Sequence, residues 1–111
     1  MKNICRTKQA PFLRTLSIIG GKWKFRILYE LACETTLRYG ELKRNLVPIT
    51  HKMLASQLKS LEKDGMIVRK EYLQIPPKVE YFLSEKGLTF LPIMKDMCEW
   101  GRIPVSYTHL T

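Results

Sequence analysis

Several features that would assign a protein to a class at first reading are missing from this chain of 111 residues. It has only three cysteines and two histidines, and none of them stands at the C-x-x-C or H-x₃-H spacing of a zinc site. The longest uncharged run is nine residues, well short of the ~20 that span a bilayer, and no stretch has the order of a secretion signal. These absences and the odd number of cysteines predict a cytoplasmic protein without a metal ion or a membrane partner.

Motifs for catalysis are absent as well. Gly20, Gly21 and Lys22 stand together, but the other glycine and the Ser or Thr of a phosphate-binding P-loop are missing. No Ser or Cys has a His and an acid at the spacing of a known nucleophilic motif. We therefore predict that the chain is not an enzyme and needs no cofactor.

Negative charge is scarcest in the N-terminal part. Residues 1–29 contain seven basic and no acidic residues, residues 30–78 nine basic and six acidic, and residues 79–111 three basic and four acidic. The total is +9, in an otherwise ordinary globular composition with 45% apolar and 26% charged residues. A small basic domain indicates a polyanionic partner, and the nearly neutral C-terminal third indicates a different role for that part.

Apolar spacing divides the chain into helices and strands. We predict helices over residues 11–19, 22–32, 39–46 and 50–64, strands over residues 66–73 and 78–83, and a final helix over residues 84–100. Pro92 falls inside the final helix, where we expect a kink or a restart because proline lacks a backbone donor. Residues 1–104 are predicted to form one domain, and residues 105–111 are expected to be a non-native or disordered tail.

The helix that follows Thr50 has the clearest pattern. Thr50 is a good N-cap residue, and Leu54, Leu58 and Leu61 form an apolar stripe opposite a basic and polar face. A short helix and a tight turn precede it, which is the helix-turn-helix arrangement, and a two-stranded wing follows. The predicted fold class is mainly α with a small β-hairpin (α+β), a winged helix-turn-helix DNA-binding domain whose second helix enters the major groove.

Two other interpretations of this region stay open. Lys52, Lys59 and Lys63 could be only the solvated face of a surface helix, and a winged helix could bind protein or RNA instead of duplex DNA. The acid-free N-terminus and the basic hairpin favour DNA. Salt distinguishes the cases, because DNA binding weakens steeply with salt whereas an apolar protein interface does not.

Six short stretches carry a family resemblance by their order and spacing. They are Ile19–Trp23, Arg38–Leu42, Ile49–Leu54, Leu58–Gly65, Pro76–Tyr81 and Cys98–Gly101. With them, residues 11–101 resemble the HxlR-type winged helix-turn-helix transcriptional regulators, bacterial relatives of the MarR group. The resemblance implies a homodimer that represses or activates genes, a recognition helix at about Thr50–Asp64, a wing at about Tyr72–Val79, and dimerisation through the first and last helices.

This interpretation gives two sets of residues. The predicted DNA-contacting residues are Arg38, Thr50, His51, Lys52, Ser56, Lys59, Arg69, Lys70 and Lys78, the last three placed around the tip of the hairpin. The predicted dimer-interface residues are Phe12, Leu13, Leu16, Leu91, Met94, Met97, Cys98 and Trp100. The last helix carries more apolar surface than a small domain covers alone, although the same stripe could pack onto its own domain. Two-fold pairing predicts a pseudo-palindromic operator.

The cysteines depart from the pattern of the family. Many members have a cysteine immediately before the proline that opens the first helix, and some use it to sense oxidants; here Ala10 occupies that position. Cys5 lies five residues upstream, so a redox-responsive regulator that uses Cys5 remains an alternative. Cys33 and Cys98 lie on apolar helical stripes and are expected to behave as small hydrophobic residues. The sequence identifies no small-molecule effector.

Overall fold

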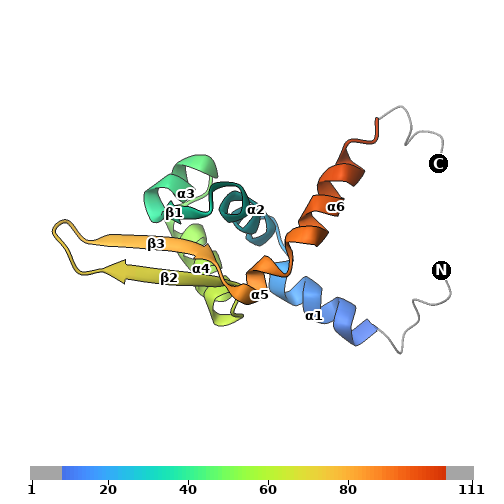
Figure 1. Cartoon of the computed structure of the whole chain (residues 1–111), viewed down its shortest axis with the longest axis horizontal. Coiled ribbons are helices and arrows are strands. Elements are labelled where there is room, and N and C mark those ends of the chain that lie inside the picture. Colours follow the sequence, from blue (N-terminus) through green and yellow to red (C-terminus); the bar gives the residue numbers. More distant parts are fainter. Residues whose placement is uncertain (1–8, 105–111) are drawn as a thin grey trace.

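Helices make up most of the chain, and a small sheet joins them. The computed structural model describes residues 9–104. Its elements are α1 (Gln9–Ile19), α2 (Lys24–Glu34), β1 (Thr36–Arg38), α3 (Tyr39–Asn45), α4 (His51–Lys63), β2 (Ile67–Tyr72), β3 (Lys78–Leu83), α5 (Glu85–Leu88) and α6 (Leu91–Gly101). In Figure 1 the β2–β3 hairpin extends from one side of the domain, and α1 and α6 project from the opposite side.

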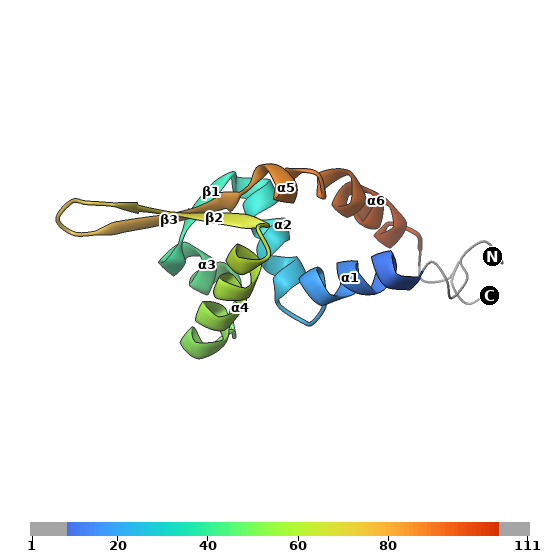
Figure 2. The same ribbon diagram turned by 90° about the horizontal axis from the view of Figure 1, so that it is seen from below.

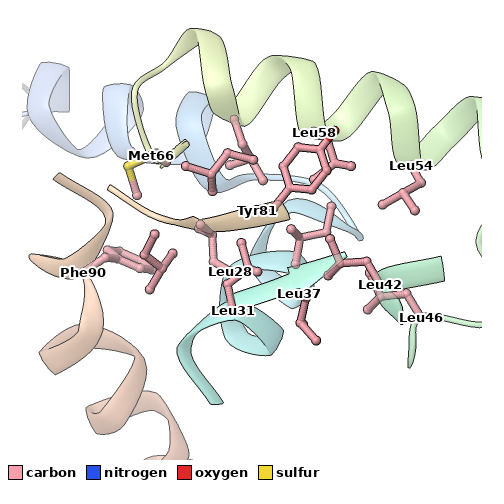
Figure 3. Close-up of a cluster of buried hydrophobic side chains, with 14 of the residues drawn as sticks. Leu28, Leu31, Leu37, Leu42, Leu46, Leu54, Leu58, Met66, Tyr81 and Phe90 are labelled. Carbon is pink, nitrogen blue, oxygen red and sulfur yellow. The ribbon is translucent and has the colours of Figure 1, made fainter. Parts of the chain in front are cut away.

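The core is a single apolar cluster between α2, α3, α4 and the sheet (Figure 3). Most of its leucines come from α2, α3, α4 and the connection between α3 and α4. Apolar residues in these amphipathic helices recur every three or four positions, so that one face of each helix points into the core. The fully buried side chains are Ile27, Leu28, Leu31, Leu42, Leu46, Leu54, Leu58 and Leu61. The core therefore fixes α4 against α2 and α3 and leaves the opposite side of α4 in solvent.

Most of the predicted elements are confirmed, and one strand was missed. No strand is predicted from the sequence before residue 66, but residues 36–38 pair with residues 80–82 of β3, so the sheet has three antiparallel strands in the order β1-β3-β2. A strand of three residues is too short to show alternation, and only its pairing with β3 defines it. The fold class predicted from the sequence, a winged helix-turn-helix, is confirmed.

The predicted final helix is two helices. Residues 85–88 form the short α5, capped by the Ser84 hydroxyl, which accepts a hydrogen bond from the Gly87 amide at 3.0 Å. The chain then restarts as α6, with Pro92 in the first turn, where its missing donor costs no hydrogen bond. Gly87 allows the close approach of α5 to the sheet, since a Cβ there would lie 2.2 Å from the Met66 carbonyl oxygen. Within residues 9–104, no helix is both long and apolar enough to cross a membrane.

Candidate nucleic-acid interface

The unit α3–turn–α4 is the geometric centre of the candidate interface. Leu42 on α3 and Leu46 and Ile49 in the connection are buried, so the turn is packed from within. Thr50 then caps α4: its Oγ1 accepts a hydrogen bond from the Met53 amide at 3.1 Å. The predicted cap is therefore confirmed, and the N-terminus of α4, with its free amides and positive dipole end, is exposed beside α3.

The outward face of α4 is polar and basic. Leu54, Leu58 and Leu61 are buried, and the predicted contact residues on the helix are exposed. They are Thr50, His51, Lys52, Ser56 and Lys59. Among residues 9–104, neither Lys52 nor Lys59 has a carboxylate within ion-pair distance. Their charges are thus free to meet an anionic partner.

The wing differs from its predicted form. Arg69 pairs with Tyr81 and Lys70 with Glu80 in the middle of the ladder, not at the tip. The connection, residues 73–77, carries no charge, and Leu73 and Ile75 in it are fully exposed. The placement of Arg69 and Lys70 at the tip was therefore wrong, because the turn is five residues long and begins after Tyr72. Only Lys78 stands next to the tip.

The two faces of the wing carry different groups, since successive residues of a strand point to opposite sides. Arg69 shares a face with Tyr81 and lines a groove together with Lys59 of α4. Lys70 shares the other face with Glu80, which is also the cross-strand neighbour of Arg38 on β1. The structure therefore places Arg38 and Lys70 on the face of the sheet opposite to Arg69, apart from the basic face of α4.

Acidic side chains partly neutralise the wing. Arg69 forms an ion pair with Glu71 at 3.2 Å, and Lys78 one with Glu80 at 3.3 Å. A hydrogen bond from the Tyr72 hydroxyl, followed by the bond from Lys78 and the charges of Lys78 and Arg38, lowers the pKa of Glu80. The charge of the Glu80 carboxylate is therefore stabilised by Tyr72, Lys78 and Arg38. The ammonium groups of Lys70 and Lys78 also lie 5.0 and 4.8 Å from the centre of the Tyr72 ring.

Two residues beside the predicted contacts, one exposed and one half-buried, were missed by the sequence reasoning. Met53 on α4 is 41% exposed, and its sulfur lies 3.6 Å from the Gln57 amide nitrogen. An apolar side chain on a recognition helix can contact a thymine methyl group, and its position outside the leucine stripe was the available signal. The second residue, Tyr39, lies half-buried at the start of α3, and its hydroxyl contacts His51.

The apolar faces of α1 and α6 are largely uncovered. Of the predicted dimer-interface residues, those that are exposed are Phe12, Leu13, Leu16, Met97, Cys98 and Trp100. Leu91 is half-buried, and Met94 is only 4% exposed, because the restart of α6 directs its first turn into the core of its own chain. Met94 therefore fits the alternative of packing within the domain. Figure 2 shows both helices on the side away from the wing.

The cysteines do not behave as small core residues. Cys33 on α2 and Cys98 on α6 are both exposed and line one surface groove beside Tyr29. A hydrogen bond with Cys33, then the charges of Cys33 and Cys98, raise the pKa of the Tyr29 hydroxyl. The prediction that they behave as small hydrophobic residues is therefore wrong, because residues 9–104 leave these sides of α2 and α6 uncovered. Cys5 lies outside the described residues. In the part of the chain that the structure describes, no three His, Cys, Asp or Glu side chains gather as metal ligands.

Fold and exposed basic helix together define a winged helix-turn-helix protein of the kind that binds DNA. The chain belongs to the HxlR-like helix-turn-helix family, whose model matches residues 18–107. It is 60% identical over 101 residues to the HTH-type transcriptional regulator YdzF of Bacillus subtilis, covering 91% of this chain and 93% of that protein. A regulator of the same type from Halalkalibacterium halodurans is 55% identical over 101 residues, covering 91% and 87%.

Solved structures give the same assignment. The redox regulator HypR in its oxidized form is 44% identical, with a TM-score of 0.79, and the match covers 86% of this chain and 97% of that one. The reduced form of the transcriptional regulator YodB from B. subtilis is 30% identical, with a TM-score of 0.70, covering 87% and 90%. The resemblance seen in the sequence is thereby confirmed. Because the relatives are transcriptional regulators and not enzymes, the prediction against catalysis is confirmed as well.

Proposed function

We propose that the chain acts as a homodimer that binds a pseudo-palindromic operator in double-stranded DNA and thereby regulates transcription in the cytoplasm. The observation that carries this proposal is the exposed face of α4, on which Lys52 and Lys59 lack partners among the described residues while three leucines hold the opposite face in the core. A helix with side chains is about 10–12 Å across and fits a major groove of about 12 Å.

Within this function, α4 and the wing have different tasks. The first turn of α4, with His51 and Lys52, meets base edges, and Ser56 and Lys59 follow one and two turns later. The wing cations, among them Lys78 beside the tip, meet phosphates or the neighbouring minor groove. Phosphate contacts supply affinity for every sequence, whereas base contacts supply specificity.

The dimer is supported by the exposed apolar faces of α1 and α6. Phe12, Leu13, Met97 and Trp100 are between 49% and 72% exposed in the single chain. Contiguous apolar surface of this kind marks an interaction site. These faces lie opposite to the wing, so pairing there about a two-fold axis leaves both copies of α4 free for successive half-sites of DNA.

Lys52→Ala tests the DNA-binding surface, with Lys95→Ala on α6 as the matched control. Both residues are exposed lysines, but only Lys52 lies on α4. We expect Lys52→Ala to weaken binding to a selected duplex by about 1–3 kcal/mol and Lys95→Ala to leave it unchanged, as measured by fluorescence anisotropy. Equal effects of the two variants would argue against α4 as the recognition helix.

Met97→Asp tests the dimer. A carboxylate buried in an apolar interface has no counter-charge, so we expect a monomer in light scattering and a large loss of operator affinity. Leu73→Asp is the control for the oligomeric state and should remain dimeric, because Leu73 is fully exposed at the wing tip. A Met97→Asp variant that remains dimeric would exclude this face.

A redox response is a second candidate, and the observation in its favour is the likeness to HypR, which is a redox regulator. Cys5 is the sensor candidate from the sequence, whereas Cys33 and Cys98 are the exposed thiols of the described part. DNA binding measured with and without peroxide separates them. Loss of the response in Cys5→Ser, with retention in Cys33→Ser and Cys98→Ser, would assign the sensor to Cys5.

A further inference from the structure

Tyr39 and His51 join the two helices of the helix-turn-helix unit at the start of α4. The Tyr39 hydroxyl oxygen lies 3.1 Å from the His51 carbonyl oxygen and 3.2 Å from His51 Nδ1. The two rings are nearly parallel, with an interplanar angle of 7° and centroids 5.9 Å apart. Tyr39 is half-buried and His51 is exposed. The tyrosine therefore contacts one side of the histidine ring, and the ring remains accessible to solvent.

The positions of the protons follow from which atoms can donate. A carbonyl oxygen only accepts, so in the 3.1 Å hydrogen bond with the His51 carbonyl oxygen the Tyr39 hydroxyl is the donor. That hydroxyl oxygen then has only lone pairs left for Nδ1. The contact at 3.2 Å is a hydrogen bond if Nδ1 carries the proton and donates it.

A hydrogen bond donated by Nδ1 to the Tyr39 hydroxyl oxygen fixes the tautomer of His51. A neutral imidazole has one N–H, so a proton on Nδ1 leaves Nε2 as an acceptor. The Tyr39 hydroxyl remains protonated at neutral pH, since burial and the neighbouring Tyr81 raise its pKa. His51 is the first residue of α4, directly after the Thr50 cap, in the turn that meets base edges in helix-turn-helix complexes.

We propose that His51 is a specificity-determining residue that reads an amino group in the major groove through Nε2, and that Tyr39 is its positioning residue. This inference rests on the proposed function. The major-groove edges of the four bases offer two hydrogen-bond donors, N6 of adenine and N4 of cytosine. His51 therefore selects adenine or cytosine over guanine or thymine on the strand that it faces.

Lysine and serine neighbours on α4 cannot give this selectivity. Lys52 only donates and favours the guanine acceptors, and the Ser56 hydroxyl accepts and donates alike. Among the exposed predicted contacts on α4, only His51 can offer an acceptor atom that carries no proton, and its ring is held by a hydrogen-bonding partner. The Tyr39 contact supplies that fixation.

Selection from randomised duplexes identifies the position. We expect the wild type to enrich a motif with one position per half-site at which adenine or cytosine is preferred. The preference at that position alone is lost in His51→Ala. In Tyr39→Phe, which keeps the ring but removes the hydroxyl, the preference at the same position shrinks and the rest of the motif persists. Tyr29→Phe, a tyrosine on α2 near α6, serves as the control and leaves the motif unchanged.

A single-atom test follows on an operator that has adenine at this position. Replacing that adenine by purine deletes the N6 amino group and nothing else. We expect the wild type to lose about 5- to 30-fold in affinity for the substituted duplex, and His51→Ala to bind the two duplexes equally. Thermal melting of each variant shows that the differences arise in the folded protein.

The outcomes separate this inference from the proposed function. If the wild type enriches no motif, sequence-specific binding is refuted and the role of His51 with it. If a motif is enriched but His51→Ala keeps every preference, the protein is an operator-binding regulator and the assignment of His51 is wrong. A His51-dependent preference for guanine or thymine would mean that Nε2 donates, which refutes the tautomer set by Tyr39.

Discussion

Replacing Glu80 by glutamine should strengthen DNA binding through the wing. Glu80 lies 3.3 Å from the Lys78 ammonium group and is the cross-strand neighbour of Arg38 and Lys70. Glutamine keeps the shape of the side chain but removes its charge. Lys78 then loses its ion-pair partner, Arg38 and Lys70 lose a neighbouring negative charge, and a carboxylate that repels phosphates is gone from the same face.

Counterion release gives the magnitude. Each additional phosphate neutralised steepens the slope of log K against log salt by about 0.9, so two wings in a dimer add about 1.8. If the wild type and Glu80→Gln bind equally at 1 M salt, this difference in slope makes the variant bind at most about 60-fold more tightly at 0.1 M salt. The free energy of unfolding should change little, because an ion pair near the surface contributes only about 0–1 kcal/mol.

Fluorescence anisotropy with a non-specific duplex between 50 and 300 mM salt measures the slope directly. Asp96→Asn on α6 is the control, since it changes the net charge equally but on the side of the domain away from the wing. A Glu80→Gln slope equal to that of the wild type would refute the reasoning, because it would show that removal of the Glu80 charge adds no phosphate contact. An equal steepening in Asp96→Asn would show that only the total charge matters.

Three further predictions concern the scaffold, and thermal or urea unfolding measures each of them. Leu58→Ala should cost about 2–5 kcal/mol because Leu58 is 2% exposed in the core; a loss under 1 kcal/mol would mean that the core under α4 collapses around the gap. Gly87→Ala should destabilise the fold because its Cβ would clash with the Met66 carbonyl, whereas Gly101→Ala has nothing within 4 Å and should be neutral or stabilising. Reversal of that order would refute the packing of α5. Thr50→Ala should cost about 1 kcal/mol through loss of the α4 cap, and Thr50→Ser, which keeps the hydroxyl, should restore most of it.

The helix-turn-helix unit was predictable because its signals are local. The Thr50 cap and the leucines of α4 fix the start and the inward face of the helix within four turns. β1 was not predictable in the same way, because its pairing with residues 80–82 defines it and no pattern of three residues can show that.

The candidate site was predictable by residue type but not by arrangement. The sequence identifies Arg69, Lys70 and Lys78 as basic, but the faces that they occupy depend on the register of β2 with β3, and their ion pairs depend on neighbours across the strands. Met94 and Met97 belong to one apolar stripe in the sequence. Their burial depends on the direction of α6 relative to the rest of the domain, which places Met94 in the core and leaves Met97 exposed.

The attachment of α6 has a mechanical consequence for an operator-binding dimer. Phe90, which packs edge-on against Phe25 with ring centroids 5.6 Å apart, and the first turn of α6 hold the helix to its domain. In the proposed dimer, α6 lies in the interface, and this aromatic pair joins it to the domain that contains the recognition helix α4. A small rotation of the domain about this aromatic contact displaces α4 by a larger distance, because α4 lies farther from the contact. In the proposed dimer, the spacing of the two half-sites therefore depends on how this aromatic contact orients α6.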